Sequence, residues 1–319
     1  MAASPAERAV RPLSSRRGLA WLLAAPLAWL SVFLALPVAI VFSISLAQQT
    51  LAMPPYTPIL VWDAAEGLRV NVTLEHYAFL LEDPFYLEAL LGSLGMAAST
   101  TLICLLIAFP MAHAMATAPA RWRALMLLAV VLPFWTSFLL RVYAWTGLLA
   151  GRGPINQMLL ALGLIDSPLP LMNSNLAVQI GLVYTYLPFM VLPLYAALDR
   201  FDGSLLEAAA DLGATPWTAF RTVTLPLVWP GVVAGSALVF IPVTGEFVIP
   251  DLLGGADTLM LGKVLWEEFF ANRAWPQAAA VAVCMLLLVA LPGLLRAAWE
   301  VVTELRRSAP APAAPRGDR

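Results

Sequence analysis

Long apolar runs separated by short polar stretches dominate the 319-residue chain. A helix needs about 20 apolar residues to cross the hydrocarbon core of a membrane, which is about 30 Å thick. Six runs are long enough, and they cover roughly residues 19–46, 89–117, 124–149, 175–198, 227–249 and 277–299. The pattern therefore predicts an all-α membrane protein with about six transmembrane helices, in contact with the lipid bilayer.

The composition supports this interpretation and excludes several classes of protein. Hydrophobic residues make up 61% of the chain and charged residues 12%, whereas an ordinary soluble domain has about 25% charged residues. A soluble domain with so few charges could not cover its surface with polar groups. The net charge is only −2, so we expect no nucleic-acid partner.

The distribution of basic residues predicts the orientation in the membrane. Six spans place both chain ends on one side, and 13 of the 18 Lys and Arg residues fall on that side. The positive-inside rule then predicts that both termini are cytoplasmic. Residues 1–18 are predicted to be a basic cytoplasmic tail, 19–299 the transmembrane domain and 300–319 a disordered cytoplasmic tail.

The predicted outer loops carry 11 acidic residues and four basic ones. An acidic outer face attracts cations from solution. The alternative is that these acids only keep the loops solvated.

Signatures of catalysis are missing from the sequence. Gly262-Lys263 is followed by Val264 instead of the Ser or Thr of a phosphate-binding loop, and neither His76 nor His113 lies in a metal-binding HExxH pattern. We therefore expect no enzymatic activity, no metal site and no cofactor bound by this chain. Transport, channel and scaffold functions remain.

The polar stretch 199–226, between the fourth and fifth predicted spans, carries signals for two short helices. Ser204 and Glu207 have the spacing of a capping box. Gly213 is placed to end the first helix in a left-handed conformation. Thr215 followed by Pro216 is typical of the start of a second helix. The sequence predicts a rigid helical knob here.

The same stretch resembles the "EAA" loop of ABC-importer permeases, EAAxxxGxxxxxxFxxIxLP. The matching positions are Glu207, Ala208, Ala209, Gly213, Phe220, Leu225 and Pro226, with Val223 in place of Ile. The resemblance implies the type I ABC importer permease fold. It also implies that the stretch docks into a groove of a separate ATPase subunit, with these residues as the ATPase-coupling residues.

Further segments resemble permeases of polyamine importers, and the run 245–255 is similar to the putrescine type. The others are 133–145, 187–195 and 266–270. The resemblance implies a bacterial inner-membrane complex with a second homologous permease, a periplasmic binding protein that delivers the polyamine, and an ATPase dimer that binds ATP and Mg. One alternative is an ABC permease for spermidine, another small organic cation or an amino-acid derivative. A second is an ATPase-independent channel or membrane scaffold.

Two ionisable residues, Arg141 and Glu246, fall within predicted spans. A charge at the bilayer centre costs on the order of 3 kcal/mol on insertion scales, so each needs a partner or water. Along straight helices both lie roughly 25–29 Å from the cytoplasmic end, so one hypothesis is an ion pair between them. The other places Glu246 on the substrate pathway, where its carboxylate would balance an ammonium group.

Other candidates for the substrate pathway are Trp135, Tyr143, Tyr184 and Asp251. Aromatic faces attract protonated amines, although aromatic residues also form interfacial belts around membrane proteins. Asp251 falls outside the predicted spans, where contact with the binding protein or with solvent is the alternative.

Overall fold

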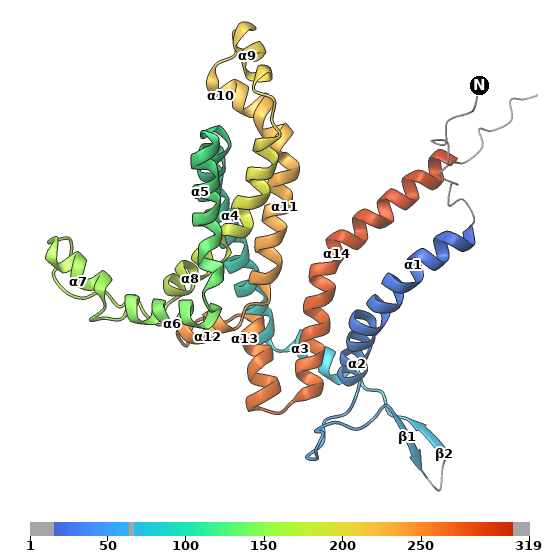
Figure 1. Ribbon diagram of the computed structural model, residues 1–319. Helices are drawn as coiled ribbons and strands as arrows, with labels where there is room; N and C mark the ends of the chain where they lie inside the picture. Colours follow the sequence, from blue (N-terminus) through green and yellow to red (C-terminus); the bar gives the residue numbers. More distant parts are fainter. Residues whose placement is uncertain (1–15, 64–66, 309–319) are drawn as a thin grey trace, which may run out of the picture.

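The computed structural model describes residues 16–63 and 67–308. Three long helices pack together at its centre: α4 (Pro84–Thr117), α8 (Asn175–Asp199) and α11 (Leu225–Thr244) (Figure 1). Cys104 of α4, Met190 of α8 and Val239 of α11 are fully buried between them. A Cβ atom on Gly231 would lie 2.6 Å from the Cβ of Ala197. Small residues thus let α11 and α8 approach closely.

A second group of helices lies beside this centre. It consists of α1 (Arg16–Leu30), a π-helical turn (Ser31–Ala35), α2 (Leu36–Ser45) and α14 (Trp275–Ser308). α2 packs against α14, whereas the start of α1 and the C-terminal end of α14 diverge from the central helices (Figure 1). Trp29 and Phe33 are more than half exposed, as expected of side chains that face lipid or another subunit.

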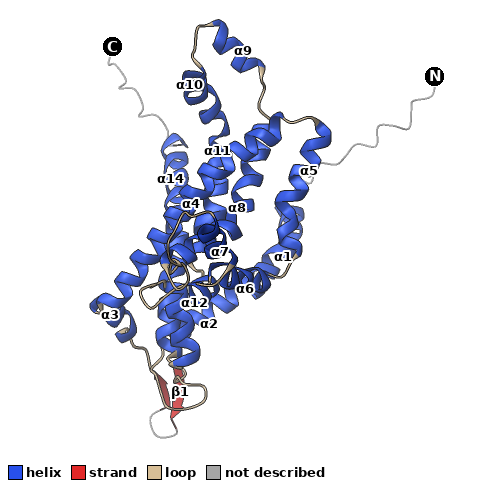
Figure 2. Ribbon diagram, turned by 90° about the vertical axis from the view of Figure 1, so that its left-hand side faces the viewer, coloured by secondary structure: helices blue, strands red, loops and turns tan. Residues whose placement is uncertain are grey.

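The segment that follows α2 forms a small hairpin and a short helix. β1 (Leu60–Asp63) pairs with β2 (Gly67–Val70) in antiparallel fashion, and α3 (Glu75–Glu82) leads into α4. The hairpin was not predicted from the sequence. It lies at the end of the molecule opposite α9 (Ser204–Asp211) and α10 (Pro216–Ala219) (Figure 2).

The six predicted runs are all found as helical segments, but not all of them are continuous helices. Within the described residues, four helices are long and apolar enough to cross a membrane, or five if one bent pair counts as a span. A shorter apolar helix, Trp275–Leu291, forms the first part of α14. α14 then continues to Ser308, so residues 300–308 are helical and not the disordered tail that was predicted to begin at residue 300. Residues 1–15 and 309–319, which include most of the basic tail, lie outside the described residues.

The predicted span 124–149 is broken. It comprises α5 (Ala120–Val131), a 3₁₀ turn (Leu132–Trp135) and α6 (Phe138–Leu149), and α7 (Pro154–Ala161) follows. The two halves of this segment are bent by 91°. Pro133 has no backbone N–H, and its carbonyl oxygen accepts both the backbone N–H of Thr136 at 3.3 Å and the Thr136 hydroxyl at 2.7 Å.

The predicted span 227–249 is interrupted as well. α11 ends at Thr244, and α12 (Val248–Leu253) and α13 (Leu261–Trp266) follow before a π-helical turn (Glu267–Ala271). A Cβ atom on Gly262 would lie 2.5 Å from the carbonyl oxygen of Glu246. Only a glycine at this position lets α13 lie directly against the break after α11.

Candidate functional site: the coupling loop and the Glu246 break

The loop between α8 and α11 forms two short helices, α9 and α10, that project beyond the central helices (Figure 1). Gly213 follows α9 with a φ of +82°, which confirms the predicted left-handed helix end. The Thr215 hydroxyl accepts the backbone N–H of Thr218 at 3.3 Å, and Pro216 is the first residue of α10. The predicted start of the second helix is therefore also confirmed.

The predicted capping box at the start of α9 is wrong. Ser204 is already the first residue of α9, and Gly203 occupies the N-cap position. The Asp202 carboxylate accepts the backbone N–H of Ser204 at 3.0 Å. This hydrogen bond favours the charged carboxylate and lowers the pKa of Asp202 below its ordinary value.

The coupling residues fall into an outward and an inward set. Glu207, Ala208 and Pro226 are exposed, while Ala209 is half-buried. Phe220 points inward, and its ring meets the ring of Phe109 of α4 edge-on with centroids 5.4 Å apart. The loop thus presents Glu207 and Ala208 outward, together with the exposed side chains of Leu212 and Trp217, while an aromatic contact anchors it to α4.

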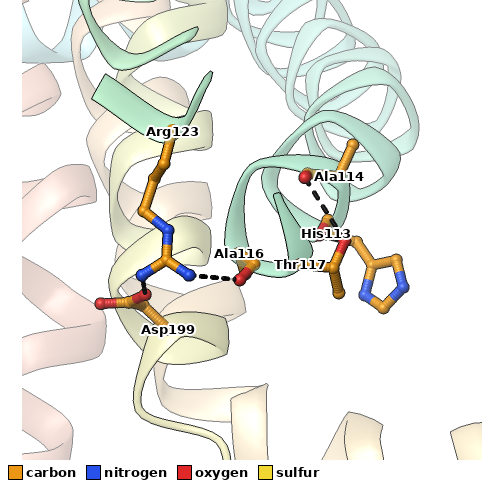
Figure 3. A network of polar contacts seen from close by, with 6 residues as sticks. All are labelled: His113, Ala114, Ala116, Thr117, Arg123 and Asp199. Atoms are coloured by element: carbon orange, nitrogen blue, oxygen red, sulfur yellow. Dashed lines mark hydrogen bonds and ion pairs between the residues drawn. The ribbon is translucent and has the colours of Figure 1, made fainter. Parts of the chain in front are cut away.

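A polar network lies at the base of this loop (Figure 3). Arg123, in the first turn of α5, donates from Nη1 to Oδ1 of Asp199 at 2.6 Å and from Nη2 to the carbonyl oxygen of Ala116 at 2.8 Å. Asp199 is the last residue of α8. Sequence reasoning missed this pair, because the partners are 76 positions apart.

Glu246 lies in the break between α11 and α12 and is 9% exposed. Its Oε2 accepts the hydroxyl of Tyr186 at 2.5 Å, and its Oε1 accepts the backbone N–H of Val248 at 3.1 Å. Tyr186 was not among the pathway candidates that the sequence identified. A hydroxyl on the same helix as the candidate Tyr184 was the only available signal.

The hypothesised Arg141–Glu246 ion pair is not formed between these two described residues. The Arg141 guanidinium instead lies over the ring of Phe134, with Cζ 5.4 Å from the centroid. The physical reason is the bend after Trp135, because the depth expected for Arg141 assumed a straight helix. Arg141 Nε is buried and has no hydrogen-bond partner among the described residues.

The remaining candidates do not hydrogen-bond the Glu246 carboxylate in the part of the chain that the structure describes. Trp135 at the bend is 75% exposed, and Tyr143 of α6 is also exposed. Tyr184 meets Trp145 edge-on and lines an apolar cavity of about 410 Å³ between α4, α5 and α8. Asp251 lies exposed on α12.

Comparison with known proteins agrees with this architecture. Residues 105–299 match the protein family described as binding-protein-dependent transport system inner membrane component. The chain is 40% identical over 263 residues to the spermidine/putrescine transport system permease protein PotB of Haemophilus influenzae, covering 82% of this chain and 87% of that protein. The chain belongs to this family of inner-membrane transport components. This membership confirms the predicted inner-membrane location. It also confirms that the chain is a permease subunit and not an enzyme.

Two further similarities support the assignment. The chain is 43% identical over 235 residues to PotB of Escherichia coli K12, covering 74% of this chain and 85% of that protein. A solved bacterial alginate ABC transporter, in complex with an alginate-bound periplasmic protein, contains a chain with the same fold at a TM-score of 0.62 and 17% identity. The match covers 87% of this chain and 93% of that one. The predicted type I ABC importer permease fold is thereby confirmed.

Proposed function

We propose that this chain is the permease subunit of an ATP-driven polyamine importer and forms half of its translocation pathway. The observation that carries the proposal is the coupling loop, in which Gly213 and Phe220 hold α9 as a projecting, exposed helix. The substrate class rests on identities of 40–43% to PotB proteins that are named for spermidine and putrescine.

The proposed partners follow from the same features. An ATPase dimer, which binds ATP and Mg, docks onto the coupling loop through Glu207, Ala208 and Ala209. A second, homologous permease completes the pathway, and a periplasmic binding protein delivers the substrate to the acidic outer loops. The start of α1 and the C-terminal end of α14 point toward the end of the molecule that carries α9 (Figure 1). This arrangement supports a common cytoplasmic side for the loop and both termini.

Glu246 is the proposed cation-binding group of the pathway. Tyr186 and Val248 donate hydrogen bonds to its carboxylate but bring no positive charge. An ammonium group of the substrate would supply that charge. The exposed rings of Trp135 and Tyr143 would add cation–π contacts, each contributing about 0.5–2 kcal/mol, and Asp251 would contribute a further carboxylate.

Among polyamines, we favour putrescine because the run 245–255, which includes Glu246, is similar to the putrescine type. The alternatives of spermidine, another organic cation or an amino-acid derivative use the same ATPase coupling. They differ only in the residues that contact the substrate.

Reconstitution tests the proposal. The chain would be co-purified with its ATPase, partner permease and binding protein and placed in proteoliposomes, and uptake of labelled putrescine and spermidine would be measured with ATP inside. We expect uptake that requires both ATP and the binding protein, with putrescine preferred. Uptake without ATP would instead support the channel alternative, and ATP-dependent uptake of neither amine would refute the substrate class.

A further inference from the structure

The polar network of Arg123 joins three elements where the coupling loop begins. Arg123 lies in the first turn of α5, Ala116 in the last turn of α4, and Asp199 at the end of α8 (Figure 3). The loop that carries α9 starts directly after Asp199. A displacement at the base of this loop therefore reaches α5 through one side chain.

The network depends on the planar geometry of the arginine side chain. The guanidinium fork gives one charge-assisted bond to Asp199 and one bond to a helix-end carbonyl that has no partner inside α4. A lysine offers a point charge and cannot reproduce this planar fork. The Nε of Arg123 is buried without a partner among the described residues, so the two Nη atoms alone hold the side chain.

Beyond its first turn, α5 is loosely packed against the central helices. The apolar cavity of about 410 Å³ separates it from α4 and α8, with Met111 and Met115 on α4, Met126 and Val130 on α5 and Leu187 on α8 among its lining residues. Close-packed interiors resist displacement, whereas this open apolar hollow leaves α5 room to move. The Arg123 network thus attaches the first turn of α5 to both α4 and α8, and the bend into α6 lies at the other end of α5.

We propose that Arg123 and Asp199 form a clamp that transmits movement of the coupling loop to α5 and to the bent α5–α6 segment. The clamp rests on the proposed ATP-driven function and adds a positioning residue to it. Without the clamp, the ATPase would still dock and hydrolyse ATP, but α5 would no longer follow the loop.

The first test measures substrate transported per ATP hydrolysed in the reconstituted complex. For Arg123→Gln and Asp199→Asn we expect this ratio to fall about two- to tenfold, as for other residues that carry coupling. The reversed pair Arg123→Asp with Asp199→Arg should recover at least part of the loss. Arg121→Gln is the matched control, because Arg121 is exposed nearby over the Trp122 ring, and it should leave the ratio unchanged.

Two results would overturn the clamp. One is an unchanged ratio in both single variants. The other is a proportional loss of uptake and ATP hydrolysis, which would indicate fewer assembled complexes and a purely structural role.

A second measurement does not depend on the substrate and so separates failure of the clamp from failure of the proposed function. Spin labels at the exposed positions Leu125 of α5 and Leu212 after α9 report the distance between the two elements, after replacement of the native cysteines Cys104 and Cys284. We expect a narrow distribution with and without ATP in the otherwise unchanged complex, and broadening on ATP addition with Arg123→Gln. Identical distributions in the two proteins would refute the clamp.

Discussion

The hydroxyl of Tyr186 donates a 2.5 Å hydrogen bond to the carboxylate of Glu246, although 60 positions separate them in the sequence. The bond ties the middle of α8 to the break between α11 and α12, and both residues are more than nine-tenths buried. The described contacts of this buried carboxylate are with neutral donors only, and a cationic substrate would supply the positive partner that they lack.

Replacing Glu246 with Gln tests this role. Gln keeps the size and an acceptor for Tyr186, so the complex should still assemble. We expect uptake of the amine to fall by about tenfold or more, because a buried opposite charge contributes more than 1.4 kcal/mol of the binding free energy. Initial uptake rates over a range of substrate concentrations measure the effect. Unchanged kinetics in assembled complexes would remove Glu246 from the pathway.

Replacing Tyr186 with Phe tests the hydrogen bond itself. The change leaves a buried carboxylate short of one donor, which costs about 1–3 kcal/mol. We expect a lower thermal unfolding temperature in detergent, followed by tryptophan fluorescence. Tyr143→Phe is the matched control, because Tyr143 is 57% exposed and should unfold like the parent. Equal stability of the two variants would show that the bond does not stabilise the fold.

Replacing Gly213 with Val distinguishes an ATP-coupled permease from a channel or scaffold. A φ of +82° strains a β-branched residue, so α9 should no longer end in the orientation that docks the ATPase. We expect loss of ATP-dependent uptake and of ATPase subunits from the purified complex. Gly163→Val introduces the same strain at a φ of +65° after α7, far from the loop in sequence, and should retain the ATPase. Retention in both variants would favour the ATPase-independent alternative.

Acid should loosen the start of α9. The pKa of Asp202 is lowered because its carboxylate accepts the Ser204 N–H. A group with a lowered folded-state pKa stabilises the fold above its unfolded pKa, and this contribution disappears as the pH falls through the folded value. We expect amide protection of Ser204 to exceed that in Asp202→Ala at pH 7. The difference should begin to shrink as the pH falls below about 4, the ordinary pKa of Asp, and vanish only below the lowered folded-state pKa of Asp202. Hydrogen exchange corrected for intrinsic rates measures it, and a pH-independent difference would contradict the capping role.

The helical fold and the coupling loop were predictable because both depend on local signals. Apolar run length identified the long helices, and Gly213, Thr215 and Pro216 set the shape of the loop through backbone rules that act over a few residues. The bend after Trp135 was not predictable from hydropathy, since both of its halves are apolar. The capping error had a similar origin, because two acceptors, Asp202 and Ser204, lie close together and the helix start decides between them.

The contacts of the candidate site were much less predictable. Tyr186 meets Glu246, and Arg123 meets Asp199, across sequence separations that no local pattern encodes. The expected partner of Glu246, Arg141, was chosen from helical depth alone. That depth was counted along a straight helix, so it does not apply to a span that is bent before Arg141.

Gly92 and Gly95, one turn apart in α4, provide a matched pair of substitutions. Together they test how closely the segment before α13 packs against α4. A Cβ atom on Gly92 would lie 2.3 Å from the carbonyl oxygen of Leu259, whereas one on Gly95 meets nothing within 4 Å. Gly92→Ala should therefore push the segment before α13 away from α4 and lower the thermal unfolding temperature. Gly95→Ala should raise that temperature, because Ala favours a helix over Gly by about 1 kcal/mol. If Gly92→Ala were as stable as Gly95→Ala, the close approach of Leu259 to α4 would be refuted.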